Sequence, residues 1–122
     1  MNKTGHTSYD LEKRTINFSK NLIEFCRNVK SGPITNPLLN QLIRSGTSIG
    51  ANYQEANGAS SKKDFKNKIY ICKKESQETK YWLHLISEVV PEQKDTIRDL
   101  WDESNQLSMI FGKIVATISK SV

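Results

Sequence analysis

The clearest helical pattern in this chain lies in residues 61–91, SKKDFKNKIYICKKESQETKYWLHLISEVVP. Small and apolar side chains recur there at alternating spacings of four and three residues, which places them on one face of a helix. They are Phe65, Ile69, Cys72, Ser76, Thr79, Leu83 and Ile86. Ser61 followed three residues later by Asp64 resembles a capping box, and Pro91 cannot continue the helix. We therefore predict a helix over about residues 61–89.

Three more segments show apolar residues at helical spacing, and clusters of turn residues separate them. The predicted helices cover about residues 9–29, 37–57 and 94–119, after a polar tail over residues 1–8. No segment shows the alternation of a strand. Long helices with short connections favour antiparallel neighbours. The 122 residues are thus predicted to form one domain of the all-α class, an antiparallel up-down four-helix bundle.

The second predicted helix opens at Asn36, which we expect to cap it ahead of Pro37. This helix contains two internal glycines, Gly46 and Gly50. Glycine inside a helix costs about 0.5 to 1 kcal/mol relative to alanine. What the missing side chain allows is the close approach of another backbone. We therefore predict that this helix is the tightly packed one.

The composition is that of an ordinary folded domain, with 36% hydrophobic and 25% charged residues. No stretch approaches the roughly 20 apolar residues that span a bilayer, so we expect a cytoplasmic protein without a membrane partner. The formal net charge is +5, with +6 on residues 1–90 and −1 on residues 91–122. An anionic partner is one interpretation of this basic excess, and solubility is the other.

No residues form a recognisable catalytic or metal site. The only histidines are His6 and His84, and neither lies near a candidate triad in sequence. Small helical ribonucleases carry an Arg-x4-His motif, but the residue at the arginine position before His84 is Thr79. Cys26 and Cys72 lie in helical patterns without metal-ligand spacing, and we interpret them as core residues. We expect no enzyme activity, no metal and no cofactor.

Lysines and tyrosines gather beside the core face of the 61–89 helix. Lysines bind phosphate backbones without reading sequence, and rings between them can stack on bases or sugars. The candidate nucleic-acid-binding residues, called the lysine stripe below, are Lys62, Lys63, Lys66, Lys73, Lys74, Lys80, Tyr70 and Tyr81. The other interpretation is a solvated face that binds nothing.

Several apolar side chains fall away from the core faces of the first and third predicted helices. They are Ile16, Ile23, Ile71, Trp82 and Leu85. Exposed apolar stripes often mark protein contacts, so we hypothesise a homo-oligomer. A wide core that covers these residues is the alternative.

Charged side chains at the edges of the core faces favour a partly buried network between helices. They are Arg14, Glu55, Glu75 and Glu78. Arg44 lies further from the inner face of its helix, and we expect it to be exposed.

Three stretches stand out, at residues 10–18 (DLEKRTINF), 41–56 (QLIRSGTSIGANYQEA) and 61–86 (SKKDFKNKIYICKKESQETKYWLHLI). They resemble the bacterial four-helix bundle family named for proteins encoded in 23S ribosomal RNA intervening sequences. That family includes the accessory variability determinant of diversity-generating retroelements.

The resemblance implies a small antiparallel bundle with a basic surface, a ring-like pentamer in relatives, and no catalysis. For the retroelement relatives it implies binding to nucleic acid and to a reverse transcriptase. Five matched residues are interpreted as a structural polar network, since polar groups near a core face usually satisfy one another. They are Arg14, Asn52, Glu55, Glu75 and Glu78.

Together these features favour a non-enzymatic, oligomeric RNA- or DNA-binding accessory protein that uses the lysine stripe on phosphates with little sequence specificity. The alternative function is a protein-interaction scaffold without a nucleic-acid role, in which the apolar outer residues bind a partner protein.

Overall fold

The computed structural model describes residues 6–120, and it describes side chains from residue 11 onward. The elements are α1 (His6–Arg27), α2 (Thr35–Asn57), α3 (Lys62–Val89), the short 3-10 helix η1 (Pro91–Gln93) and α4 (Lys94–Lys120). These described residues contain no strand. The prediction of an all-α protein with four helices is therefore confirmed.

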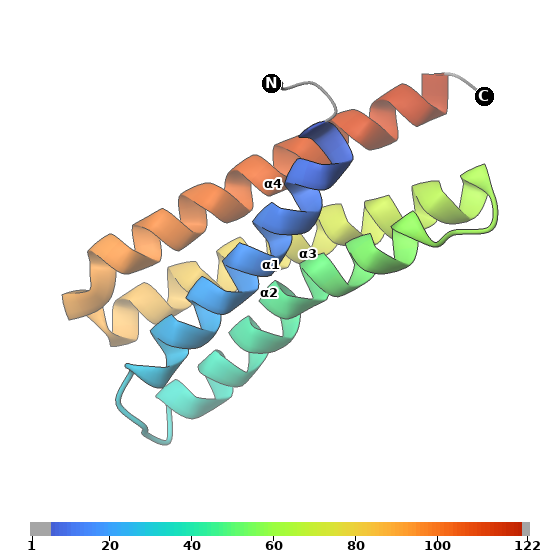
Figure 1. Ribbon diagram of the computed structural model, residues 1–122. Coiled ribbons are helices and arrows are strands. Elements are labelled where there is room, and N and C mark those ends of the chain that lie inside the picture. Colours follow the sequence, from blue (N-terminus) through green and yellow to red (C-terminus); the bar gives the residue numbers. More distant parts are fainter. Residues whose placement is uncertain (1–5, 121–122) are drawn as a thin grey trace.

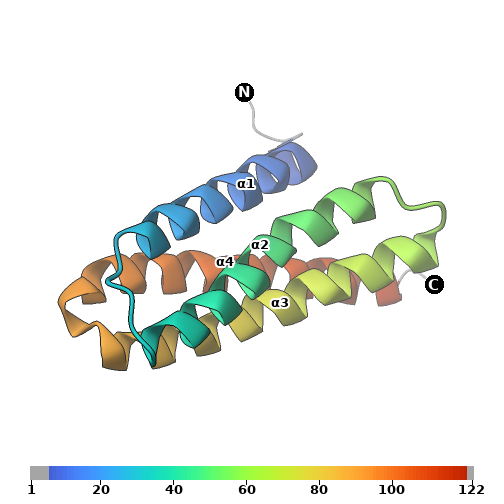
Figure 2. The ribbon, with the colours of Figure 1, turned by 90° about the horizontal axis from the view of Figure 1, so that it is seen from below.

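Consecutive helices run in opposite directions along the bundle (Figure 1). The connections after α1 and after α3 lie at one end, and the α2–α3 connection lies at the other end in both views (Figure 2). Helix α3 packs along both α2 and α4, whereas α1 packs mainly on α2 and only lightly against α4. The bundle is therefore uneven, and α3 has a side that faces α2 and a side that faces α4.

The ends of the first two helices differ from the predicted ones. Helix α1 begins at His6, so the predicted tail is wrong for residues 6–8, while residues 1–5 lie outside the described residues. Helix α2 begins at Thr35, and Asn36 does not cap it. The Asn36 Oδ1 instead accepts from the Gly32 backbone N–H at 3.1 Å, because the chain already turns into the helix before this residue. Asn36 therefore braces the α1–α2 connection.

The start of α3 is the one that the sequence predicts. Ser61 has extended backbone angles, and its Oγ accepts from the Asp64 backbone N–H at 3.0 Å. This bond satisfies one of the amide groups that the first turn of a helix leaves without a partner.

The two glycines of α2 mark its closest contact with α1. A Cβ atom built on Gly46 would lie 2.1 Å from Cδ2 of Leu22, and one on Gly50 would lie 3.2 Å from Cβ of Thr15. Both α1 residues are buried. The prediction of tight packing in α2 is confirmed, but at Gly46 the near neighbour is a leucine side chain rather than a backbone. Leu22 fills the space that the glycine leaves open.

Small hydroxyl residues fill the centre where α2, α3 and α4 meet. The Thr79 hydroxyl lies 3.0 Å from the Ser45 hydroxyl, and the Ser104 hydroxyl donates to the Ser76 carbonyl at 2.8 Å. All four residues are fully buried. Because their hydroxyls are hydrogen-bonded, they fill narrow core positions without the cost of an unsatisfied polar group.

The two cysteines are free thiols inside the fold. Burial raises the pKa of Cys26 to about 11 and that of Cys72 to about 12. Both thiols stay protonated at neutral pH, which is the poorly reactive form. Their role as small core residues follows from this environment.

Candidate nucleic-acid interface

Three lysines of the lysine stripe lie on the side of α3 that faces α4. Lys66, Lys73 and Lys80 are each half-buried. The Cε of Lys73 lies 3.7 Å from the Cβ position of Gly112 in α4, and the Lys80 Nζ donates to Asn105 Oδ1 at 2.9 Å. Long lysine side chains can bury their stems while keeping the ammonium in water. Lys73 and Lys80 therefore lie along the α3–α4 boundary and do not stand free in solvent.

Trp101 of α4 is the residue that sequence reasoning missed. The Lys80 ammonium lies 5.1 Å from the centroid of its ring, and the side chain is 36% exposed. This distance is within the range of a cation–π contact. The sequence feature that could have pointed to Trp101 is its position directly after Leu100. A large ring one residue past the core face of a helix lies on the adjacent side of that helix.

The remaining residues of the stripe form the outer surface of α3. Lys62, Lys63, Lys74 and Tyr70 are exposed, and the Lys74 ammonium lies 5.9 Å from the centroid of the Tyr70 ring. Tyr81 is also exposed, but its ring packs edge-on against Trp82 at 5.0 Å. The structure therefore brings Tyr70 together with a lysine, whereas Tyr81 lies against Trp82 of its own helix.

The two sides of α3 differ in how their charges are compensated. On the α2 side, the Lys68 ammonium lies 2.7 Å from Glu55, and Arg44 pairs with both Glu75 and Glu78. The six lysines of the stripe form no ion pair with any carboxylate among residues 11–120. The positive charge of α3 is therefore left uncompensated on its outer surface and toward α4.

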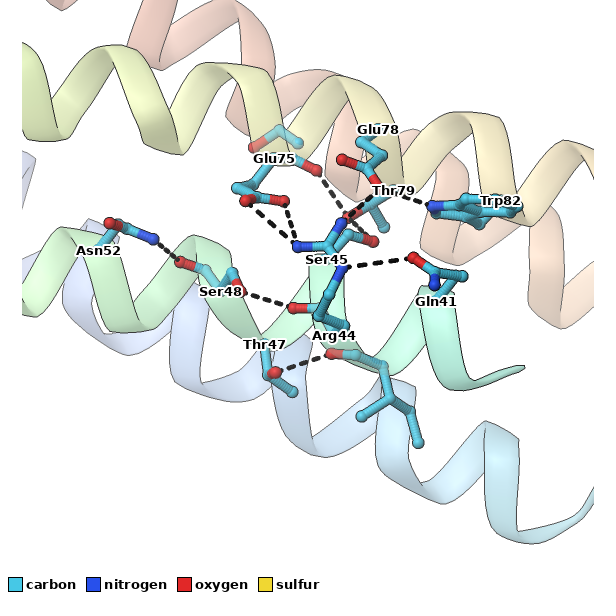
Figure 3. Close-up of polar contacts among 12 residues, drawn as sticks. Gln41, Arg44, Ser45, Thr47, Ser48, Asn52, Glu75, Glu78, Thr79 and Trp82 are labelled. Carbon is cyan, nitrogen blue, oxygen red and sulfur yellow. Dashed lines mark hydrogen bonds and ion pairs between the residues drawn. The ribbon is translucent and has the colours of Figure 1, made fainter. Parts of the chain in front are cut away.

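Figure 3 shows how Arg44 reaches from α2 to α3. Its guanidinium donates to both oxygens of Glu75 at 3.4 Å and to Glu78, and the Trp82 indole N–H donates to Glu78 at 2.9 Å. These bonds, from Trp82 first and from Arg44 next, lower the pKa of Glu78, while burial acts in the opposite direction. Arg44 itself is exposed, as its position predicts.

The single polar network expected between the helices is three separate contacts. Arg14 binds Glu103 of α4 at 2.7 Å, because this part of α1 faces α4 and not α3. Glu55 binds Lys68, and Glu75 with Glu78 binds Arg44. The Asn52 amide donates to the Ser48 carbonyl of its own helix at 2.9 Å. Two of these contacts thus tie α2 to α3, and one ties α1 to α4.

A groove of about 610 Å³ lies between α1 and α4, where the two helices contact each other lightly. Its lining includes the Arg14–Glu103 pair, the carboxylates of Glu24 and Asp99, and the amide of Asn21. Carboxylates repel phosphate groups. Electrostatic repulsion therefore disfavours a phosphate backbone at this groove.

Comparison with known families identifies the family of this chain. Residues 7–113 match the sequence profile of the family described as 23S rRNA-intervening sequence protein. The chain belongs to this family. The resemblance seen in the three sequence stretches is thereby confirmed, and the matched region contains the whole lysine stripe.

A solved structure supports the same assignment for this member of the family. It is a protein of unknown function from the S23 ribosomal protein family of Bacteroides thetaiotaomicron, with a TM-score of 0.78 and 27% sequence identity. The similarity covers 89% of this chain and 97% of that chain. No curated protein matches the sequence.

The apolar residues outside the core faces form two groups in this family member. Ile16 and Ile23 of α1 are 42% and 43% exposed, and Ile23 lines a shallow groove with Ile43 of α2. Ile71, Trp82 and Leu85 of α3 are half-buried, and Trp82 packs against the core. A wide core thus accounts for part of the second group, while the two isoleucines of α1 stay open to contact.

Within residues 6–120, no helix is long and apolar enough to cross a membrane.

The Glu78 contacts give the stability of this family member a defined pH dependence. A carboxylate with a lowered pKa in the folded state stabilises the fold fully above its unfolded pKa, about 4.3. This contribution is lost as pH falls through the lower folded value. Glu78→Gln should therefore destabilise by up to about 1 kcal/mol at pH 7, and the gap should narrow below about pH 4. Urea denaturation at both pH values measures it, and a gap that is constant with pH would contradict this assignment.

Proposed function

We propose that this protein is a non-enzymatic, oligomeric nucleic-acid-binding accessory protein that holds phosphate backbones on the lysine stripe with little sequence specificity. The observation that carries the proposal is the absence of ion pairs on this stripe among residues 11–120, whereas Lys68, Glu75 and Glu78 on the α2 side of the same helix are all paired. A stripe of lysines without carboxylates attracts polyanions, and lysine contacts to phosphates carry no base information.

The position of two of these lysines adds a second argument. Lys62 and Lys63 occupy the first turn of α3, where the positive end of the helix dipole disfavours cations. The fold itself gains nothing from charges at that place. The role proposed for Lys62 and Lys63 is to bind an anionic partner.

The context of the binding follows from the family. Its description refers to 23S rRNA intervening sequences, so ribosomal RNA that carries such a sequence is one proposed partner. The retroelement relatives suggest the other, a complex in which the protein assists a reverse transcriptase. In both settings the lysine stripe binds the phosphate backbone of the nucleic acid with little sequence specificity.

Fluorescence anisotropy with labelled 20-nucleotide RNA and DNA tests the proposal. Non-specific binding through phosphates gives dissociation constants of about 1 to 100 µM near physiological salt and tighter binding at lower salt. We expect saturable binding of both nucleic acids at about 50 mM salt. A flat titration up to about 100 µM protein at this salt concentration would overturn the proposal.

The oligomeric part of the proposal rests on Ile16 and Ile23. We expect light scattering at about 10 µM to give several times the mass of one chain, because exposed apolar groups favour association. Ile16→Asp with Ile23→Asp should give the mass of one chain, with an unchanged circular dichroism spectrum. Ile34→Asp is the matched control, since Ile34 is 69% exposed in the α1–α2 connection. A monomeric wild type would remove the oligomer from the proposal.

A protein-interaction scaffold is the second candidate function, and the same two exposed isoleucines favour it. In that case the apolar surface binds a partner protein and the lysines act as solubilising groups. Capture of partners from the native host, with and without nuclease, separates the two functions. Partners that stay bound after nuclease treatment, together with a flat anisotropy titration, would favour the scaffold.

A further inference from the structure

A shallow groove lies between α3 and α4 at the end of the bundle where η1 joins them. Its volume is about 240 Å³. Buried Leu83 and Ile97 form its apolar base, and Trp101 forms one wall. The exposed residues His84, Lys94 and Arg98 lie around it.

We propose that this groove binds an unpaired nucleobase against Trp101, so that the interface takes single-stranded nucleic acid in preference to duplex. The inference rests on the proposed function, because the lysine stripe leads directly to the groove through Lys80, whose ammonium lies over the Trp101 ring. The groove is smaller than the roughly 300 to 1,000 Å³ that hold drug-sized ligands. One flat base suits its size, its apolar base and its aromatic wall.

The chemistry around the ring favours a nucleotide over an uncharged ligand. A base that stacks on Trp101 displaces the Lys80 ammonium from the ring, and the ammonium is then free to bind the phosphate of the same strand. Lys94 lies beside the groove as a further cation, while Arg98 is already paired with Asp95 at 2.7 Å. The pair formed by Lys74 and Tyr70 on the outer surface repeats the arrangement of a ring with a cation above it.

The preference for single strands follows from access to the base. In a duplex the base faces are stacked inside and cannot reach an aromatic side chain, whereas a single strand presents them freely. Phosphate contacts alone would treat both forms alike. A base site at Trp101 should therefore give single strands a higher affinity than duplex.

Tryptophan fluorescence of Trp82→Phe tests the inference, because the chain has two tryptophans and this variant leaves Trp101 alone. We expect a 12-nucleotide strand of thymidines to quench the fluorescence and to bind about tenfold more tightly than the matching 12-base-pair duplex. Trp101→Leu should weaken binding of the single strand about tenfold and leave duplex binding unchanged. Tyr70→Leu, at an exposed position, repeats the test at the second ring.

The outcomes separate this inference from the proposed function. Equal affinity for both forms without quenching of Trp101 overturns the base site and leaves the phosphate interface intact. Failure of either form to bind at about 50 mM salt overturns both. Quenching by the single strand, with loss of its preference in Trp101→Leu, supports the base site.

Discussion

Lys66→Glu combined with Lys73→Glu is expected to weaken nucleic-acid binding by at least about 100-fold at 50 mM salt. The two residues lie seven positions apart on α3, about 10 Å along the helix, with no ion pair to a carboxylate among residues 11–120. Replacing both removes two phosphate contacts and places two like charges against the backbone. Anisotropy with a labelled 20-nucleotide strand measures the effect.

The matched control is Lys13→Glu with Lys20→Glu. These two lysines are exposed on α1, also seven residues apart, and their exchange changes the net charge by the same amount. We expect this control to lose less than about tenfold in affinity, because it acts only through the overall charge. Equal losses in the two variants would show that net charge, and not the lysine stripe, determines binding.

Gly46→Ala is expected to destabilise the fold by about 1 to 2 kcal/mol, although alanine is the better helix former. The new methyl would lie 2.1 Å from Leu22 Cδ2 in the core, so Leu22 must move. Leu22 is completely buried, and overpacking of this kind costs about 1 to 3 kcal/mol. Urea denaturation measures the change.

A double-mutant cycle with Leu22→Ala isolates this contact. The Leu22→Ala change alone should cost about 2 to 5 kcal/mol through the cavity that it leaves. In the double variant the methyl of residue 46 enters part of that cavity, so the combined loss should be smaller than the sum of the two by at least about 0.5 kcal/mol. Additive losses, or a higher melting temperature for Gly46→Ala alone, would contradict the close approach of α1 and α2.

Features that depend on one helix were predictable from the sequence. The alternating spacing from Phe65 to Ile86 predicts the buried face of α3, because each residue of a helix is rotated by the same angle about one axis. Residues three or four positions apart therefore share a face. The Ser61 cap is equally local, since donor and acceptor lie three residues apart. The exposed state of Arg44 follows from the same geometry.

Features that depend on which helices are neighbours were not predictable. Glu103 is the partner of Arg14 because α1 lies beside α4 at that height, a relation that no spacing within either helix records. The place of Trp101 in the candidate site also depends on which helices are neighbours, since Lys80 reaches it across the α3–α4 boundary. The partly buried state of Lys66, Lys73 and Lys80 also follows from the position of α4.

The structure gives α3 two different sides. Toward α2 its charges are paired, by Glu55 with Lys68 and by Arg44 with Glu75 and Glu78, and these pairs help to hold the bundle together. Toward α4 and on the outer surface, the lysines of the stripe form no ion pair among residues 11–120. One helix therefore serves both the stability of the fold and the proposed binding of nucleic acid.

The salt dependence of binding tests the central claim most directly. For single strands, the logarithm of the binding constant falls against the logarithm of the salt concentration with a slope of about −0.7 for each phosphate that is neutralised. We expect Lys73→Gln to make this slope shallower by about 0.7 relative to the wild type, and Lys13→Gln to leave it unchanged. Identical slopes for the wild type and Lys73→Gln, measured between about 50 and 200 mM salt, would contradict a phosphate interface on the lysine stripe.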